Sequence, residues 1–338
     1  MKHKKKSSIT DVAIAAGVSK TTVSGVLNQK AGLDPDTVAR VQKAINDLGY
    51  SPRKNRLRTG HQGDEQKDIG TGSISFVFPG EDQQKTLQTA LSLQLLGGAE
   101  RFLFQNDINL ITSFWQEETD EIEEKVPIGV QNRQVDGLIF RAGWRIDNVM
   151  GKIRGLPMVQ VFRGIAPPSV DEVDVDNEQI GRLAFETLAA KGHRRIALLG
   201  AVRKSQAKRW NCETFQFLAK ESGVEVVPYL DENDEVCIER FLADVNRPEA
   251  VFSISDQKPL LKFISGLCQL GIRPGHDIDV VAISHDPTPF TFLDGTISLI
   301  NIQADEIGYS AAQLLIERIK DPGMSRRRIL VDPKLYDL

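Results

Sequence analysis

The chain has 338 residues, with 42 Lys and Arg against 46 Asp and Glu, and its formal net charge of −4 by itself indicates no particular partner. Its three cysteines are widely spaced and form no CxxC pair, so we expect no disulfide, no metal site and no cofactor, in a reducing compartment. The sequence has no run of about 18 apolar residues and no secretory signal, which argues against a membrane protein or a periplasmic receptor and predicts a cytoplasmic protein.

The first informative stretch is 9–28, ITDVAIAAGVSKTTVSGVLN, which indicates two short amphipathic helices separated by a bend at Gly17. Ser8 and Asp11 are suited to cap the first helix, and Ser19 is a natural N-cap for the second. The second helix would turn outward a small, hydrogen-bonding face formed by Lys20, Thr21, Ser24 and Asn28. The major groove of DNA admits such a helix, and side chains of this kind read base edges. The alternative is an ordinary helical hairpin with a solvated face.

A third helix follows, and after it a break and a basic segment. Asp34-Pro35 is typical of a helix start, apolar residues recur at helical spacing up to Leu48, and Gly49 marks the end. Three such helices can share one small core. After the break at 50–52 come four basic residues, Arg53, Lys54, Arg56 and Arg58. This strip suits phosphate groups, although most charge runs are only solvated surface.

Charge is segregated along the chain. Residues 1–60 carry 12 Lys and Arg against 4 Asp and Glu, whereas the remaining residues carry 30 against 42. A small basic head on an acidic body is the expected electrostatic pattern of a nucleic-acid-binding module, because affinity for duplex DNA depends largely on phosphate neutralisation. This distribution favours the DNA-binding interpretation of the first three helices.

Residues 8–60, with SITDVAIAAGVSKTTVSGVLN, the third helix and Gly49-Tyr50-Ser51-Pro52, resemble the head of a LacI/GalR-type transcription regulator. The resemblance implies a homodimer whose two heads read a pseudo-palindromic operator in double-stranded DNA, with a hinge helix in the minor groove. It also implies a bacterial, nucleoid-associated protein with a periplasmic-binding-protein-like core that senses a small-molecule effector such as a sugar. The expected domains are a helix-turn-helix head at 1–52, a basic hinge and linker at 53–72, and a two-lobed core at 73–338.

Carried over by position, the resemblance assigns roles in DNA binding. The base-reading residues would be Lys20, Thr21 and Ser24. The residues that position the DNA backbone would be Ile9, Thr10, Ser19, Thr22, Asn28 and Thr37. Gly25 stands where many members carry an arginine that contacts guanine, so one bidentate contact contributing about 1–3 kcal/mol of discrimination is absent or replaced.

The hinge is shorter than is common in the family. Arg53 and Lys54 would contact phosphates there, and Leu57 is the candidate for an apolar wedge between base steps. A flexible basic linker is the alternative interpretation. Residues 60–72 are polar and would tether the head to the core.

The remainder of the chain alternates between apolar runs and helical stretches. The apolar runs, which we expect to be strands, are 73–79, 109–114, 135–140, 157–161, 196–199, 224–228, 251–254, 280–283 and 296–300. The expected helices are 87–105, 117–131, 177–191, 212–222, 236–244, 258–270 and 305–320. Continuous apolar strands between helices predict parallel sheets covered on both faces, and the length exceeds one comfortable core. We therefore expect a small all-α head followed by a two-lobed α/β core.

The family resemblance is weaker in the core but extends to the C-terminus, through 135–139, 173–177 and 192–197. It places the crossovers between the lobes near 161–168, 284–286 and 301–303. His193, in a Gly-His-Arg turn, is expected to be structural, since it has no partners at metal-ligand spacing.

The candidate effector residues lie beyond strand ends, because ligands of parallel α/β sheets bind outside the carboxyl ends of the strands. Asp256 matches the position of a family aspartate that accepts hydrogen bonds from a ligand hydroxyl. Arg141 and Trp144 follow another strand, and the family's ligand-binding arginine falls on either Arg209 or Asn211, depending on how residues are counted. A carboxylate, an arginine and an aromatic ring fit a sugar and a nucleobase alike.

The sequence contains no GxSxG elbow, P-loop, HExxH helix or GxGxxG fingerprint, so we expect no enzyme. The leading hypothesis is a ligand-responsive, sequence-specific transcription repressor. Two alternatives stay open at this point. One is a two-lobed small-molecule binding protein or enzyme with a degenerate head, favoured by Gly25 and the short hinge. The other is a regulator that responds to a protein partner.

Overall fold

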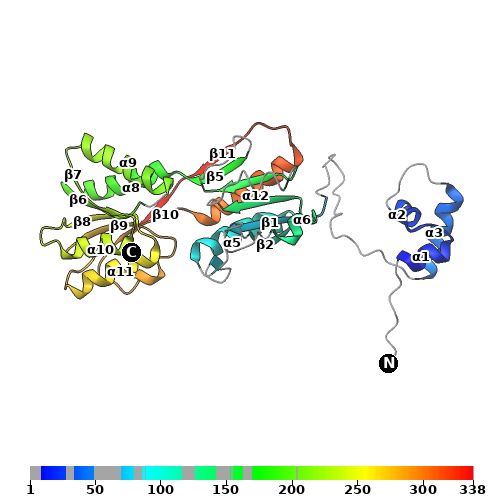
Figure 1. The fold of residues 1–338 in the computed structure, drawn as a ribbon, viewed down its shortest axis with the longest axis horizontal. Coiled ribbons are helices and arrows are strands. Elements are labelled where there is room, and N and C mark those ends of the chain that lie inside the picture. The colour runs from blue at the N-terminus through cyan, green and yellow to red at the C-terminus, as the bar shows by residue number, and fades with distance from the viewer. Residues whose placement is uncertain are drawn as a thin grey trace, which may run out of the picture. The chain divides into compact units, whose positions relative to one another are not determined.

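A computed structural model describes residues 9–27, 34–48, 70–79, 86–87, 89–115, 126–141, 153, 155–162, 170–202 and 205–337. By its internal contacts the chain divides into two compact units, Met1–Asp64 and Glu65–Leu338. The described part of the smaller unit is helical, and the larger unit contains two sheets with their covering helices (Figure 1).

The small unit packs α1 (Ile9–Ala16), α2 (Lys20–Leu27) and α3 (Pro35–Asp47) around one core. Val12, Val23 and Val41, one from each helix, are fully buried at its centre. Gly17 makes the bend between α1 and α2 with φ at +66°, a conformation that glycine adopts without strain. The three helices and the bend that the sequence predicts are confirmed.

The first lobe of the large unit is a six-stranded parallel sheet with the order β11-β5-β4-β3-β1-β2. Its strands are β1 (Ser73–Pro79), β2 (Asn109–Trp115), β3 (Gly137–Arg141), β4 (Met158–Val161), β5 (Asp171–Val175) and β11 (Arg328–Val331). Its helices are α5 (Ala90–Gln105), α6 (Ile128–Gln131) and α12 (Ala304–Lys320). Alternate strand residues face opposite ways, so Phe76 packs toward α5 and α12 while Val77 packs toward α6.

The second lobe has the strand order β12-β10-β9-β8-β6-β7, parallel except for β12, which runs antiparallel to β10. Its strands are β6 (Arg195–Ala201), β7 (Glu225–Asp231), β8 (Ala250–Ser253), β9 (Asp279–Ile283), β10 (Ser298–Asn301) and β12 (Lys334–Asp337). Its helices are α8 (Asn177–Ala190), α9 (Gln206–Glu221), α10 (Asp234–Ala243) and α11 (Gln257–Gln269), with a short η1 (Thr288–Phe290). α8 and α9 cover one face of the sheet and α10 and α11 the other (Figure 1).

The expected two-lobed α/β core with parallel sheets is confirmed, and all nine expected strands are present. Three strands were not expected, namely β5, β11 and β12. α9 begins at Gln206, earlier than the predicted start at 212. Of the predicted helix at 117–131, the described residues contain only α6.

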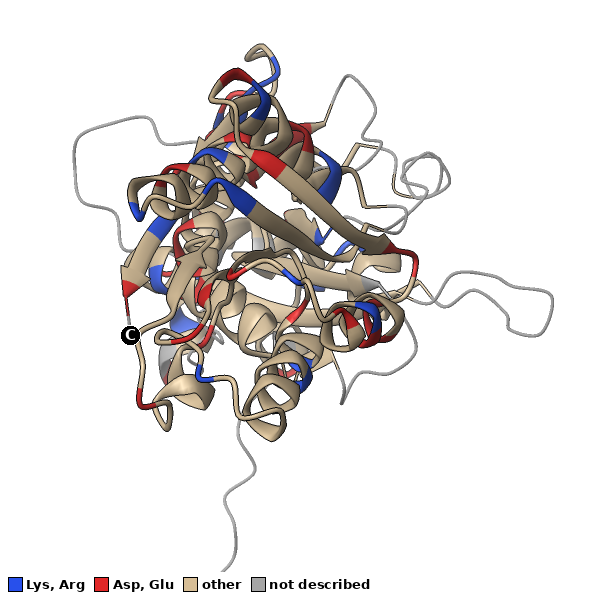
Figure 2. Cartoon of the chain, turned by 90° about the vertical axis from the view of Figure 1, so that its left-hand side faces the viewer, with Lys and Arg blue, Asp and Glu red and all other residues tan. Residues whose placement is uncertain are grey.

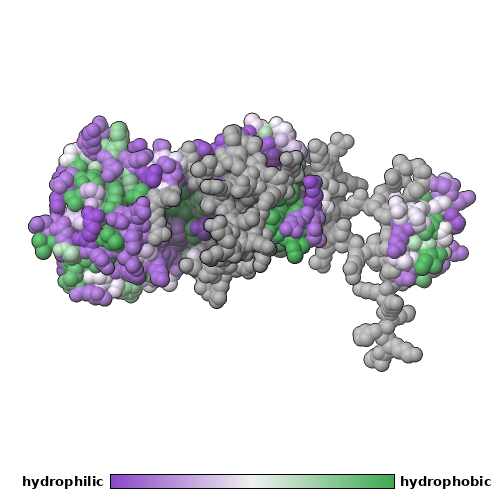
Figure 3. Space-filling view, viewed as in Figure 1, coloured by the Kyte–Doolittle hydropathy of each residue, from purple (hydrophilic) through white to green (hydrophobic). Residues whose placement is uncertain are grey.

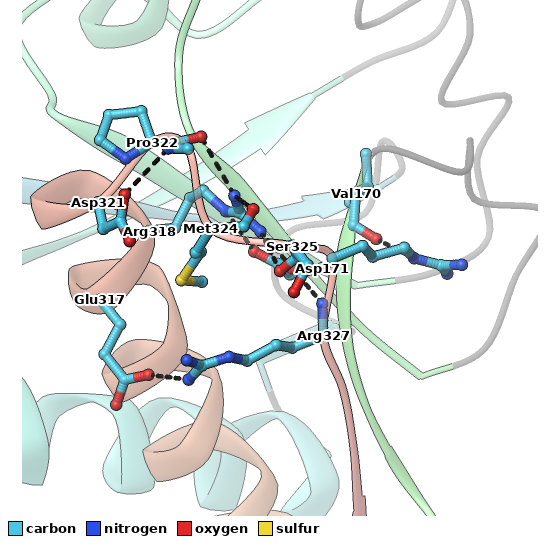
Figure 4. Close-up of polar contacts among 11 residues, drawn as sticks. Val170, Asp171, Glu317, Arg318, Asp321, Pro322, Met324, Ser325 and Arg327 are labelled. Carbon is cyan, nitrogen blue, oxygen red and sulfur yellow. Dashed lines mark hydrogen bonds and ion pairs between the residues drawn. The ribbon is translucent and has the colours of Figure 1, made fainter.

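β5 is buried although its sequence, DEVDV, contains three acidic residues. Asp171 is 1% exposed and its carboxylate pairs with Arg318 at 2.8 Å (Figure 4). Glu172 pairs with Arg326 and Arg328 at 3.3 and 3.1 Å. Buried carboxylates need such partners. The arginines that pair with these carboxylates belong to a segment some 150 residues later in the chain. The local sequence of β5, which is rich in acidic residues, therefore did not predict a buried strand.

Among the described elements, three connections pass between the lobes, and two of the expected places were wrong. β5 belongs to the first lobe and α8 to the second, so the first crossover lies at residue 176 rather than at 161–168. The pass between β10 and α12, at 302–303, confirms the one expected near 301–303. The last connection joins β11 to β12 at 332–333, and 284–286 stays within the second lobe. The error followed from missing β5 and β11 as strands.

α5 and α12 approach closely because each has a glycine where they cross. A Cβ atom at Gly98 would lie 1.7 Å from the carbonyl oxygen of Asp305, and one at Gly308 would lie 2.0 Å from that of Leu95. Arg101 of α5 adds an ion pair to Asp305 at 3.5 Å. The two helices therefore form one closely packed layer beneath the first sheet.

Candidate functional site

The start of α2 is capped by Ser19. The Thr22 N–H donates to Ser19 Oγ at 3.1 Å, and the hydroxyl oxygens of the two residues are 2.8 Å apart. This confirms the predicted N-cap. The buried face of α2 then contains Val23, while Lys20 and Thr21 at the start of the helix are exposed.

A surface hollow of about 470 Å³ lies at the bend between α1 and α2. Three of the predicted DNA-contacting residues, Thr10, Ser19 and Lys20, line it together with Gly17. The fold of the head thus brings Thr10, from the first turn of α1, onto one surface with Ser19 and Lys20 at the start of α2.

Thr37 lies in the first turn of α3. Its N–H and its Oγ1 donate to Asp34 Oδ2 at 3.0 and 2.9 Å, and Arg40 donates to Thr37 Oγ1 at 3.3 Å. Asp34 therefore caps α3 as predicted. The hydroxyl of Thr37 is held at a helix N-terminus, a place that favours a phosphate oxygen.

Gly25 is half-buried within α2. The side chains of Ile9 and Ser24, and the whole of Asn28, Arg53, Lys54, Leu57 and Trp144, lie outside what the structure describes.

The positive charge of the head lies in segments that flank its helices. Residues 9–27 and 34–48 carry 3 Lys and Arg against 4 Asp and Glu, so the rest of 1–60 carries 9 Lys and Arg and no acidic residue. On the face of the second lobe in Figure 2, acidic and basic residues are interspersed, and in Figure 3 the visible surface of this lobe is mainly hydrophilic with scattered hydrophobic residues. The net positive charge of residues 1–60 therefore comes from the segments before, between and after the helices of the head.

In the core, polar groups from both lobes meet beyond the carboxyl ends of the strands. Arg141 is the last residue of β3 in the first lobe, whereas Asp256 follows β8 and His285 follows β9 in the second. The charge of Asp256 acts on both Arg141 and His285, which places the three groups near one another. Asp256 also pairs with Lys208 of α9, whose Nζ lies 3.1 Å from Oδ1.

Burial dominates the electrostatics of this cluster. It lowers the pKa of Arg141, and the charge of Asp256 opposes that effect. Burial also lowers the pKa of His285 to about 4, where Asp256 acts to raise it and Arg141 to lower it. His285 is therefore neutral near pH 7. Its Nδ1 is buried and has no hydrogen-bond partner among the described residues.

One hydrogen bond joins the lobes at this cluster. Gln94 of α5, in the first lobe, donates from Nε2 to the carbonyl oxygen of His285 at 2.8 Å. Beside it, Gln257 of α11 donates to the carbonyl oxygen of Asp286 at 3.1 Å. The loop after β9 is thus held from both lobes.

The predicted effector residues have different environments. Arg141 and Asp256 come together from opposite lobes. Arg209 is exposed on α9. Asn211 is buried between α8 and α9, and in the amide orientation that satisfies its neighbours it donates to the carbonyl oxygen of Asn177 at 2.9 Å. The amide of Asn211 is therefore used in helix packing.

His285 and Lys208 are members of the cluster that sequence reasoning missed. His285 directly follows β9, so the rule that selected Asp256 beyond β8 could also have selected it. Lys208 lies inside a helix, and nothing local distinguishes it from other lysines. Its place in the cluster is known only through its contact with Asp256.

His193 lies at the amino-terminal ends of the strands of the second sheet, the end opposite the cluster. Its Nε2 is 2.6 Å from Asp279 Oδ2, and Lys191 Nζ is 2.6 Å from Oδ1 of the same carboxylate. Asp279 begins β9, so this cluster secures the loop before β6 and supports the expected structural role of His193. Within the described ranges, no group of His, Cys, Asp and Glu side chains is arranged to hold a metal ion, and no helix is long and apolar enough to span a bilayer.

The chain matches three family descriptions in succession. Residues 8–53 match bacterial regulatory proteins of the lacI family, residues 72–235 match periplasmic binding proteins and the sugar binding domain of the LacI family, and residues 185–337 match a periplasmic binding protein-like domain. The transcriptional repressor PurR of Mannheimia succiniciproducens is 26% identical over 341 residues, covering 97% of this chain and 96% of the relative.

Solved structures agree on the fold. The lac repressor dimer bound to operator and the anti-inducer ONPF superposes with a TM-score of 0.67 at 19% identity, over 98% of both chains. The complex of the transcriptional regulator CelR with cellobiose gives a TM-score of 0.63 at 23% identity, again over 98% of both chains. The family descriptions together cover the head and both lobes, and two of the three name the LacI family. The chain therefore belongs to the LacI family of bacterial regulatory proteins and is a DNA-binding transcription regulator with a two-lobed, periplasmic-binding-protein-like core.

Proposed function

We propose that this regulator is a homodimeric repressor whose operator affinity is set by a small molecule bound between the lobes of the core. The observation that carries the proposal is the Ser19-capped helix α2, with its exposed polar start on a three-helix head. The proposed domains are the head at 1–52, the hinge and linker at 53–72 and the core at 73–338. The proposal places the protein in the bacterial cytoplasm, on the nucleoid. The names of the relatives, PurR repressor and lac repressor dimer on operator, support it.

In the complex with a pseudo-palindromic operator, α2 lies in the major groove of each half-site. Lys20, Thr21 and Ser24 contact base edges, as short polar side chains at the start of a recognition helix do. Around them, the groups that position the DNA backbone are Ile9, Thr10, Ser19, Thr22, Asn28 and Thr37. Arg53 and Lys54 neutralise phosphates, and Leu57 enters the minor groove. With Gly25 in α2, no arginine reads the base at that position.

The effector occupies the cluster at the strand ends, between Arg141 of the first lobe and Asp256 of the second. Trp144 and Arg209 complete the proposed site, one beyond the same strand as Arg141 and the other beside Lys208 on α9. Arg141 and Asp256 come from different lobes, so a ligand that contacts both binds more tightly to one degree of lobe closure than to another. Such a difference in affinity shifts the population toward the conformation that binds better.

β3 offers a route from this cleft toward the DNA-binding unit. Arg141 ends the strand, and Asp136 directly precedes its first residue. The carboxylate of Asp136 accepts hydrogen bonds from the N–H groups of Thr71 and Gly72 at 2.7 and 2.6 Å. Residues 71–72, through which the chain enters the core, are thus hydrogen-bonded to the residue just before β3. The other end of β3 faces the proposed effector. Lobe closure moves both ends together, and the spacing of the two hinges in the dimer changes with it.

The test is selection of bound sequences from a random DNA pool at about 0.1 M salt, where nonspecific binding is reduced. A two-fold symmetric motif is expected. Lys20→Ala or Thr21→Ala should change the selected bases, whereas Arg53→Ala should weaken binding to all sequences alike, and Lys220→Ala, an exposed change in α9, serves as the charge control. Unselective binding that disappears with salt would overturn the proposal.

A further inference from the structure

Among the described residues, no carboxylate pairs directly with the guanidinium of Arg141. Arg141 is half-buried at the carboxyl end of β3, and its side chain makes no hydrogen bond or ion pair with any residue that the structure describes. Burial lowers the pKa of Arg141, which reflects the cost of removing its charge from water. A guanidinium in a partly desolvated place normally has a carboxylate or carbonyl partner, because an unpaired charge there is unfavourable.

Asp256 does not fill that role. Its charge reaches Arg141, but its carboxylate is paired with Lys208 at 3.1 Å and its side chain is 80% exposed. Asp286, the next carboxylate in the sequence after His285, accepts a hydrogen bond from the Thr288 N–H at 3.0 Å within its own turn. Among the described groups, the cluster therefore contains one ion pair and one unneutralised cation.

His285 supplies a neutral hydrogen-bonding group beside this cation. Its burial keeps the imidazole uncharged near pH 7, so one ring nitrogen donates and the other accepts. Nδ1 is buried without a partner among the described residues. A buried polar atom with no partner is uncommon in folded proteins and indicates a group that something else satisfies. Arg141 comes from the first lobe and His285 from the second, so one molecule can satisfy both only by lying between the lobes.

We propose that the effector is a small organic anion, with a carboxylate or phosphate that binds Arg141 and a neighbouring polar group that hydrogen-bonds to His285. Sugar acids and sugar phosphates have this chemistry, whereas neutral sugars and nucleobases bring no negative charge to Arg141. The carboxylate or phosphate geometry also matches the planar fork of a guanidinium, which can donate two parallel hydrogen bonds. The inference rests on the proposed function, since it names the ligand class of the same cleft.

The test compares each neutral sugar with its own anions. Thermal unfolding of the full-length protein is measured at constant ionic strength with three matched sets at equal concentration. These are glucose, gluconate and glucose 6-phosphate; ribose, ribonate and ribose 5-phosphate; and galactose, galactonate and galactose 6-phosphate. At least one anion should raise the Tm more than its neutral counterpart, and which anion acts shows whether the group is a carboxylate or a phosphate. If no anion exceeds its neutral counterpart, the proposal is wrong.

Variants then assign the effect to Arg141. For the active anion, Arg141→Met should raise the Kd measured by calorimetry roughly 10- to 100-fold, the loss expected for a charged hydrogen-bonded pair. Arg194→Met removes an exposed arginine just before β6, at the amino-terminal ends of the strands and away from the cluster, and should leave the Kd unchanged. Arg141→Lys keeps the positive charge but lacks the two parallel N–H donors of the guanidinium, so it should retain part of the affinity. Its Kd still tests the role of Arg141 if Arg141→Met does not fold. An anion whose Kd is the same in all three variants binds elsewhere and overturns the assignment.

The two proposals fail in different ways. A neutral sugar that raises the Tm of the wild type and of Arg141→Met equally refutes the anionic effector but leaves a ligand-responsive regulator. A DNA selection without a symmetric motif refutes the repressor, whatever binds at Arg141.

Discussion

Arg318 ties the C-terminal segment to the first lobe, and its removal would leave a buried carboxylate unpaired. The side chain of Arg318 is 14% exposed and that of Asp171 is 1% exposed, and Nε and Nη2 donate to the two carboxylate oxygens at 2.8 and 2.9 Å. The same guanidinium donates to the carbonyl oxygens of Pro322, Met324 and Ser325 (Figure 4). Arg318→Met keeps an apolar stem and removes every one of these bonds.

Breaking a buried ion pair on one side costs about 3–5 kcal/mol, because the remaining charge is left without a partner. For a core of this size, such a loss corresponds to a decrease in Tm of roughly 6–20 °C. Arg327→Met is the matched control. Arg327 pairs with Glu317 at 2.6 Å, but their side chains are 51% and 39% exposed, and an exposed pair contributes about 0–1 kcal/mol.

The assay is urea and thermal unfolding of the wild type and both variants, followed by circular dichroism. The free energy of unfolding should decrease by several kilocalories per mole in Arg318→Met and hardly at all in Arg327→Met. The Arg327 N–H that donates to Asp171 at 2.8 Å is a backbone group and is kept in both variants. Equal losses in the two variants would refute the argument that pairing at Asp171 is what allows β5 to be buried.

Three further predictions follow from contacts in the core. Gly98→Ala should destabilise the first lobe by more than the roughly 1–3 kcal/mol that overpacking usually costs, because the added Cβ would lie 1.7 Å from the Asp305 carbonyl oxygen. A Tm equal to that of the wild type would contradict the close packing of α5 and α12. Asp136→Ala should reduce the change in operator affinity that the effector produces, measured by DNA titration with and without the effector, and an unchanged response would exclude β3 as the route. The pKa of His285 is lowered from 6.5 to about 4, so the unfolded chain takes up more protons in this range and stability should fall as the pH drops from about 6.5 to 4, by up to about 3 kcal/mol. His285→Gln should flatten this part of the stability profile, and an equally steep profile in that variant would show that another group is responsible.

The head could be predicted from the sequence almost completely, because its signals are local. Gly17 at the bend, Ser19 before α2 and Asp34 before α3 act on backbone groups within three residues of themselves. The apolar spacing that buries Val23 and Val41 follows from helical periodicity alone. None of these features depends on a distant part of the chain.

The core was predictable only where strands are apolar. β6, with the sequence RIALLGA, could be recognised by itself, since it is buried on both faces of a parallel sheet. β5 could not, because its acidic residues are tolerated in the interior only through arginines contributed by the C-terminal segment. Missing β5 displaced the first crossover in the prediction and hid the role of β11 as its partner.

By itself, the amino-acid sequence determined the three-helix head with its capped helix α2, the alternation of strands and helices, and Arg141 and Asp256 as residues beyond strand ends. Periodicity, caps and strand ends are set by neighbouring residues, so they can be read from one segment at a time. Only the tertiary structure decided which lobe each strand joins, and that Asn211 serves helix packing. It also decided that Lys208 pairs with Asp256, while the Arg141 guanidinium and His285 Nδ1 have no hydrogen-bond partner among the described residues. The physical reason is that pairing, desolvation and charge balance depend on groups far apart in the chain that folding alone brings together.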